Sequence, residues 1–87
     1  MSVMVMPKWK AKMRRLTRRG YIVSLRREIS PRDREAWYRA EASVVREVVY
    51  RSGRRVVARS HWTSDPDKAL VALQGELGIA EEELWRA

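Results

Sequence analysis

The stretch KWKAKMRR (residues 8–15) decides how the first third of the chain is interpreted. Within it, the cations Lys8, Lys10, Lys12 and Arg14 alternate with Trp9, Ala11 and Met13. Alternation of this kind is typical of a half-buried β-strand, with the apolar side chains directed inward. The phase breaks at Arg15, where a bulge or a turn is expected. The pattern therefore predicts a strand over residues 8–13 whose outer face is a row of cations.

A second strand is expected to follow and to pair with the first. Gly20 supplies a residue that readily adopts the positive φ of a hairpin loop. Alternation then resumes at Tyr21, Val23 and Leu25. Ser30 and Pro31 have the chemistry of a helix N-cap and a first helical residue. Residues 8–42 are therefore predicted to form a β-β-α unit with a helix over about 31–41.

The second half is expected to follow the same plan. Runs rich in β-branched residues, 43–50 and 54–63, predict another hairpin with a tight turn at Ser52 and Gly53. The segment SDPD (residues 64–67) is typical of a helix start, and the helix would carry Leu70, Leu73 and Leu77 before Gly78. Gly20 and Gly53 are 33 residues apart. The two ββα units could therefore have arisen by internal duplication, or they could be two independent solutions of the same kind.

The predicted fold class is α+β: two β-hairpins in a four-stranded antiparallel sheet with two helices on one face, in the order ββαββα. Residues 1–87 form a single domain. Its parts are an N-terminal arm (1–7), a first ββα unit (8–42), a second ββα unit (43–78) and a short acidic C-terminal helix (79–87). One rival is a single helix over 31–51, because its valines also fit a helical stripe. Their β-branched side chains and the Ser52-Gly53 pair favour the hairpin.

Composition leaves little basis for catalysis. The chain has 87 residues, no cysteine and one histidine, His61. Thiolate chemistry is excluded, and no spacing of histidine and carboxylates predicts a metal site. Four isolated glycines do not form a phosphate-binding loop. We expect a non-enzymatic, cytoplasmic protein that needs no cofactor or metal, with a homodimer through a sheet edge or the arm as an open alternative.

Charge is distributed unevenly along the chain, whose net charge is +8. Residues 1–27 hold nine cations and no acid, whereas residues 64–87 hold two cations and six acids. A gradient of this kind predicts a basic face and an acidic back, as a polyanion binder requires. The alternative explanation is a general bias toward arginine in the genome, which would supply basic residues without any ligand, since 15 of the 19 cations are arginine. The acid-free first segment favours a nucleic-acid partner.

Residues two apart on a strand are separated by roughly 6.6–6.8 Å, a pitch that can follow successive phosphates. The sequence therefore predicts DNA binding, favoured over RNA, through the phosphate backbone and the first hairpin. Sequence preference is expected to be weak, because an arginine that reads bases needs a carboxylate to hold it, and Glu28 and Glu47 are the nearby options. The predicted contact residues are Lys8, Lys10, Lys12, Arg14, Arg15, Arg18, Arg19, Arg51, Arg54 and Arg55.

Locally, residues 48–77 resemble the three-stranded arm-binding domains of phage-type tyrosine integrases. The resemblance rests on a hairpin, the His-Trp-Thr segment (residues 61–63) and the helix start that follows. It covers about a third of the chain and uses turn and cap chemistry that many folds share. The second hypothesis, from another class, is a small phage-type inhibitor, for example of CRISPR effectors or a host factor. Such a protein would dock its basic face on an acidic partner protein.

Overall fold

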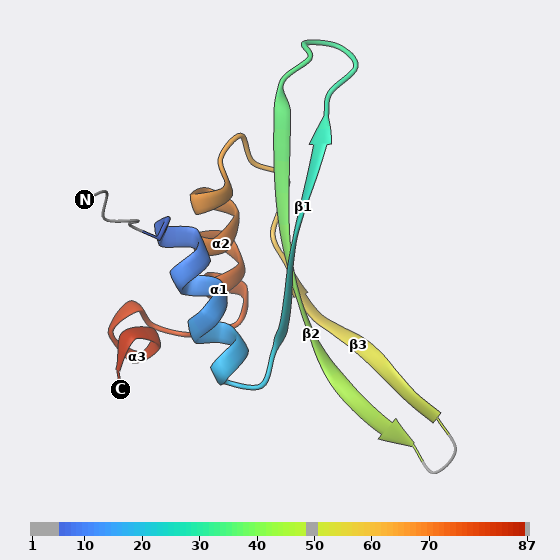
Figure 1. Cartoon of the computed structure of the whole chain (residues 1–87), viewed down its shortest axis with the longest axis vertical. Helices are drawn as coiled ribbons and strands as arrows, with labels where there is room; N and C mark the ends of the chain where they lie inside the picture. The colour runs from blue at the N-terminus through green and yellow to red at the C-terminus, as the bar shows by residue number, and fades with distance from the viewer. Residues whose placement is uncertain (1–5, 49–50, 87) are drawn as a thin grey trace, which may run out of the picture.

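The computed structural model describes residues 6–48 and 51–86, and side chains outside 46–52. Its elements are α1 (Lys8–Arg18), β1 (Ile22–Ile29), β2 (Ala36–Val48), β3 (Arg51–Arg59), α2 (Pro66–Glu76) and α3 (Glu81–Trp85). The strands form one antiparallel sheet in the order β1-β2-β3. All helices lie on one side of this sheet (Figure 1). The protein is α+β as predicted, but the four-stranded ββαββα arrangement is wrong.

The predicted strand over residues 8–13 is helix α1, so there is no hairpin between it and residues 21–25. Trp9, Ala11 and Met13 alternate as in a strand, but this pattern covers only five residues. Over a longer stretch, Trp9, Met13 and Leu16 have the helical spacing i, i+4, i+7. Leu16 is fully buried, and Trp9 and Met13 pack against the core. Lysine, alanine, methionine, arginine and leucine are also strong helix formers. The break in the alternation near Arg15 therefore reflects the 3.6-residue period of a helix, not a bulge or a turn after a strand.

The predicted helix over 31–41 is also wrong, and the rival helix over 31–51 with it. Strand β2 begins at Ala36, and its residues 36–43 pair with the whole of β1. Ser30 and Asp33 do accept backbone N–H groups, as capping residues would, but they do so in the loop between β1 and β2. The same side-chain chemistry stabilises turns and helix starts, so it could not distinguish them. The two halves of the chain do not repeat.

The hairpin predicted in the second half is confirmed as β2 and β3, but the predicted turn at Ser52 and Gly53 is wrong. Gly53 lies inside β3 opposite Arg46, not in a tight turn with Ser52. Residues 49 and 50, predicted as the end of a strand, lie outside the described residues. The register shifts between Ala42 and Ser43, where a β-bulge increases the local twist. The hairpin extends well beyond the helices (Figure 1).

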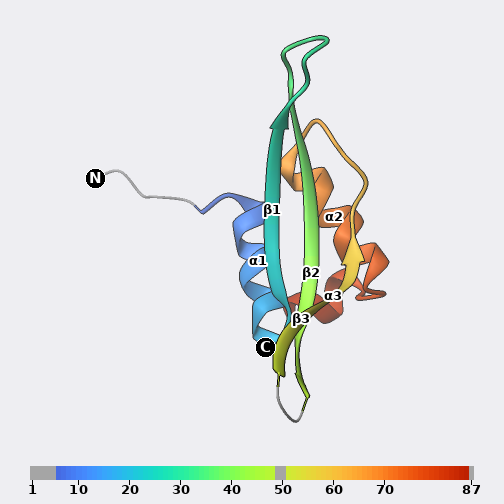
Figure 2. The same cartoon turned by 90° about the vertical axis from the view of Figure 1, so that its right-hand side faces the viewer.

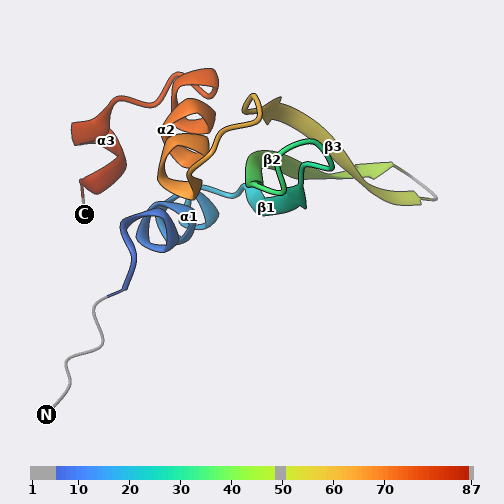
Figure 3. The ribbon, with the colours of Figure 1, turned by 90° about the horizontal axis from the view of Figure 1, so that it is seen from above.

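The core lies between the helices and one face of the sheet. Its fully buried members are Leu16, Ala40, Ala42, Ala69, Leu70 and Leu73, joined by Leu84. Alanines at the centre of β2 let α2 approach the sheet closely (Figure 3). The helix predicted after residue 64 is confirmed, with Asp65 as its N-cap: the carboxylate accepts the N–H of Asp67 at 2.8 Å. Within residues 6–48 and 51–86, no helix has the length and apolarity needed to cross a membrane.

Candidate nucleic-acid interface on the open face of the sheet

The face of the sheet directed away from the helices is uncovered, and we call it the open face (Figure 2). Side chains alternate along β2, so Tyr38, Ala40 and Ala42 pack in the core. The residues between them, Trp37, Arg39 and Glu41, therefore point to the open face. Their partners across β1 are Glu28, Arg26 and Ser24. Arginine, tryptophan and carboxylate side chains thus occupy the centre of this face.

Three arginines, Arg26, Arg39 and Arg59, line an open cavity of about 290 Å³ together with Ser24 and Glu41. Arg26 and Arg39 are directly opposite each other on neighbouring strands. Like charges in this position destabilise a sheet unless an anion lies between or above them. An anionic group placed between Arg26 and Arg39, on the side of the cavity away from Glu41, would therefore relieve this repulsion.

Two of these arginines have their guanidinium groups fixed by neighbours. Arg59 donates from Nε to Oε2 of Glu41 at 2.7 Å. Arg39 donates from Nε to the carbonyl of Ser60 at 3.1 Å, and its Cζ lies 5.7 Å from the centroid of the Trp62 ring. A guanidinium that is already oriented loses less conformational freedom when it binds a ligand.

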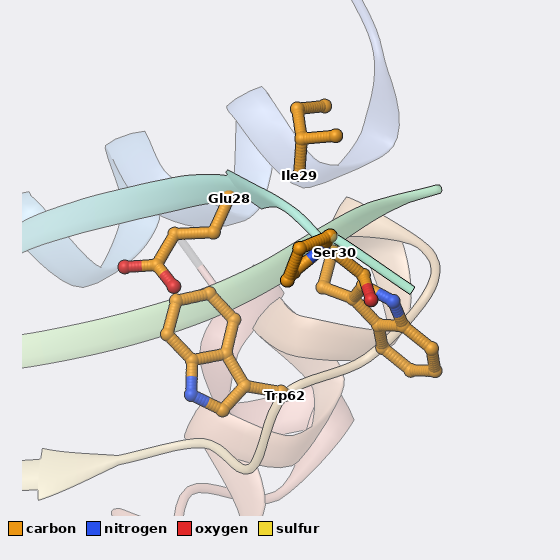
Figure 4. Close-up of a pocket in the computed structure, with 6 residues that line it drawn as sticks. Glu28, Ile29, Ser30 and Trp62 are labelled. Carbon is orange, nitrogen blue, oxygen red and sulfur yellow. The ribbon is translucent and has the colours of Figure 1, made fainter. Parts of the chain in front are cut away.

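A smaller cavity of about 210 Å³ adjoins the arginines at the base of the β1–β2 loop (Figure 4). The side chains of Glu28 and Trp62 point toward each other across it. Trp37, Ile29, Ser30 and Pro31 complete the lining. Trp62 thus lies between a cation and an anion: Arg39 is beside its ring, and Glu28 is across the cavity.

The β2–β3 hairpin carries two of the predicted contact residues, Arg54 and Arg55, and both are exposed. Arg54 is opposite Val45 and so shares the register of the open face, whereas Arg55 is opposite Val44 on the other face. The third predicted residue of this group, Arg51, begins β3, and its side chain lies outside the described part of the structure.

The cations predicted to form a ladder are distributed around helix α1. Lys12 is buried, 4% exposed, and its Nζ lies 3.2 Å from Oε2 of Glu81 in α3. Arg19 binds the carboxylate of Glu83 at 3.3 Å and the carbonyl of the same residue at 2.7 Å. Arg15 stacks over Trp85, with 5.6 Å from its Cζ to the ring centroid. These three side chains therefore attach α3 to α1.

Glu81 is the centre of this attachment. Its carboxylate accepts hydrogen bonds from Trp85 Nε1 at 2.7 Å, Gln74 Nε2 at 2.9 Å and Lys12 Nζ. These donors favour the ionised form and lower the pKa of Glu81 from 4.5 to about 2, with Trp85 contributing most. The acidic C-terminal segment thus neutralises part of the basic N-terminal segment instead of forming a separate acidic back.

The remaining predicted cations of α1 are exposed: Lys8, Lys10, Arg14 and Arg18. Three of them, Lys10, Arg14 and Arg18, are spaced four residues apart and form one stripe on the helix. We call this stripe the helix set. Helix α1, which carries this set, lies on the side of the sheet opposite the open face (Figure 3).

Arg26, Arg39, Arg59, Trp37 and Trp62 were not predicted as site residues. The signal for Trp37 and Arg39 was present in the alternation of residues 36–42, where small or aromatic inward residues alternate with Trp37, Arg39 and Glu41. Assigning a helix to 31–41 hid that alternation. The Glu41–Arg59 contact joins residues 18 positions apart and required the register of β2 and β3.

In residues 6–48 and 51–86, no three His, Cys, Asp or Glu side chains are grouped to hold a metal ion. His61 is exposed, between β3 and α2. Comparisons of the chain with protein families, with curated proteins and with solved structures find no match.

Proposed function

We propose that the protein binds nucleic acid, with duplex DNA favoured over RNA, and that the open face of the sheet is the contact surface. The observation that carries this proposal is the uncovered sheet centre, where Arg26, Arg39 and Arg59 converge on one cavity. An anionic polymer would relieve the repulsion between Arg26 and Arg39, which are opposite each other on adjacent strands.

The shape of the sheet supports duplex DNA. The major groove of B-DNA is about 12 Å wide and admits a two-stranded β-ribbon. The corresponding groove of an RNA duplex is deep and too narrow for side chains to read. The projecting β2–β3 hairpin offers such a ribbon, with Arg54 on one face and Arg55 on the other. In a groove, these arginines would reach the phosphates of its two walls.

Fluorescence anisotropy with labelled duplex DNA tests the proposal. At low salt we expect binding, and four to six neutralised phosphates would make log K fall with log salt at a slope of roughly −4 to −5. Unlabelled duplex DNA should compete better than duplex RNA or single-stranded DNA of the same sequence. Absence of binding to all three polymers at low salt would refute the proposed function.

A protein partner is the second candidate, favoured by one observation. Val45, Val56 and Val57 on the β2–β3 hairpin are 60%, 39% and 43% exposed. Apolar side chains gain little from contact with phosphates but are typical of protein interfaces. An inhibitor or interaction protein could place this hairpin and its arginines on an acidic partner surface. If nucleic acids do not bind, this becomes the leading hypothesis.

A further inference from the structure

Arg59 differs from the other arginines of the open face in having a carboxylate partner. Its Nε donates to Glu41 at 2.7 Å, and the two residues are directly opposite each other on β3 and β2. Both side chains remain accessible, 51% for Arg59 and 32% for Glu41. Within the described residues, neither Arg26 nor Arg54 forms an ion pair.

The contact with Glu41 leaves a defined edge of the guanidinium for a ligand. Nε is used, so the two Nη atoms present parallel N–H donors in a fixed plane. Guanine displays two acceptors, N7 and O6, on its major-groove edge, and these match a pair of parallel donors. The hydrogen bond to Glu41 therefore orients Arg59 for bidentate contact.

Glu41 also makes Arg59 poorly suited to bind a phosphate. Its carboxylate would repel a phosphate placed beside Arg59, because the two anions would lie within a few ångströms of each other. A guanine edge is uncharged and carries no such penalty. The carboxylate thus disfavours backbone contact at Arg59 and leaves base contact favourable.

We propose that Arg59, oriented by Glu41, selects a guanine in the major groove of duplex DNA. This inference rests on the proposed function, which supplies the duplex, and adds a sequence preference at one base pair. Arg59 would contact the base, and Glu41 would act as a positioning residue. Arg26 and Arg54 would contact phosphates and contribute affinity without preference.

The experiment begins with selection of bound duplexes from a random library by the full chain, followed by anisotropy on the selected duplex. We expect one position where guanine is preferred. Each bidentate arginine–guanine pair is worth about 1–3 kcal/mol, so replacing that base pair should weaken binding roughly 5- to 150-fold. Replacing the guanine by 7-deazaguanine, which lacks the N7 acceptor, should also weaken binding.

Variants assign the preference to Arg59. Arg59→Ala should abolish the preference at that position while binding to unrelated duplexes persists. Arg59→Lys keeps the charge but not the planar pair of donors, and should also lose the preference. The lysine variant replaces the alanine variant in this test if the alanine variant does not fold. The matched control, Arg54→Ala, should weaken binding to all duplexes alike and keep the preference.

Glu41→Gln separates positioning from simple charge. Removing a negative charge should strengthen binding to every duplex, whereas the weaker, uncharged hydrogen bond from Arg59 to glutamine should reduce the guanine preference. We expect both effects together. Duplex binding with no guanine preference, or a preference unchanged in Arg59→Lys, would overturn this inference and leave the proposed function intact. No duplex binding at low salt would overturn both.

Discussion

Lys10 and Lys12 are two residues apart in the sequence but lie on different sides of helix α1. Lys10 is exposed, with its Nζ 5.5 Å from the centroid of the Trp9 ring. Lys12 is buried and bonded to Glu81. A strand would have given both side chains the same surroundings. The helical period of 3.6 residues separates them, so only one is available to a ligand.

Replacing these lysines should have different effects on stability. Lys12→Ala removes a charged hydrogen bond and the buried stem of the side chain, and should lower the free energy of unfolding by roughly 1–3 kcal/mol. Lys10→Ala, the matched control, should change it by less than about 0.5 kcal/mol. Urea denaturation followed by circular dichroism measures both. Equal effects would contradict the helical placement of Lys12.

Glu81 should make stability depend on acid pH. Because its pKa falls from 4.5 to about 2 on folding, the ionised carboxylate stabilises the folded chain. That contribution is complete above about pH 4.5 and is lost as the pH falls toward 2. The Glu81 side chain is 54% exposed, so screening by solvent reduces the stabilisation that the ionised carboxylate contributes.

Thermal melting between pH 6 and pH 2 tests this contribution. The parent protein should lose stability relative to Glu81→Gln as the pH falls through that range, since glutamine does not titrate. Glu82→Gln is the matched control, because Glu82 makes no side-chain hydrogen bond within the described residues. If the parent and the Glu81 variant lose stability in parallel, the hydrogen-bond cluster around Glu81 does not exist as described.

Elements were predictable from the sequence where one pattern fitted one structure. The helix at Pro66–Glu76 and the helix at Glu81–Trp85 followed from caps and apolar spacing, and β1 followed from the alternation after Gly20. Residues 8–13 fitted both periods over their short length, and only the burial of Leu16 decides between them. Residues 36–42 have helix-favouring composition, but packing of Ala40 and Ala42 under α2 overrides it.

Two glycines report on the elements directly. Gly20 has φ +96°, in the turn that ends α1, whereas Gly53 lies within β3 with open space where a side chain would project. Gly20→Val should cost about 1 kcal/mol or more, because a β-branched residue resists positive φ. Gly53→Val should be neutral or stabilising, because valine favours strands. If Ser52 and Gly53 formed the turn, Gly53→Val would lower the melting temperature as Gly20→Val does.

At the scale of the whole molecule, folding redistributes the charge gradient of the sequence. The acidic C-terminal segment pairs with the basic helix α1 through Lys12 and Arg19. The prediction of an acidic back opposite a basic first hairpin therefore misplaced the accessible charge. Arg26 comes from the acid-free first segment, whereas Arg39 and Arg59 come from residues 28–63, which hold eight cations and five acids. They meet on the open face because the strands lie side by side. This site depends on register, which composition does not reveal.

The most direct test is a comparison of three proteins in one anisotropy salt series on the same duplex DNA. The first is the parent; the second carries Arg26, Arg54 and Arg55 changed to glutamine; the third carries the helix set, Lys10, Arg14 and Arg18, changed to glutamine. Both variants lose three charges. If the sheet and its hairpin bind the backbone, the second protein should lose affinity and its salt slope should become shallower by about 2.7, whereas the third should remain close to the parent. The reverse order, with the larger loss in the helix-set variant, would contradict an interface formed by the open face and the β2–β3 hairpin.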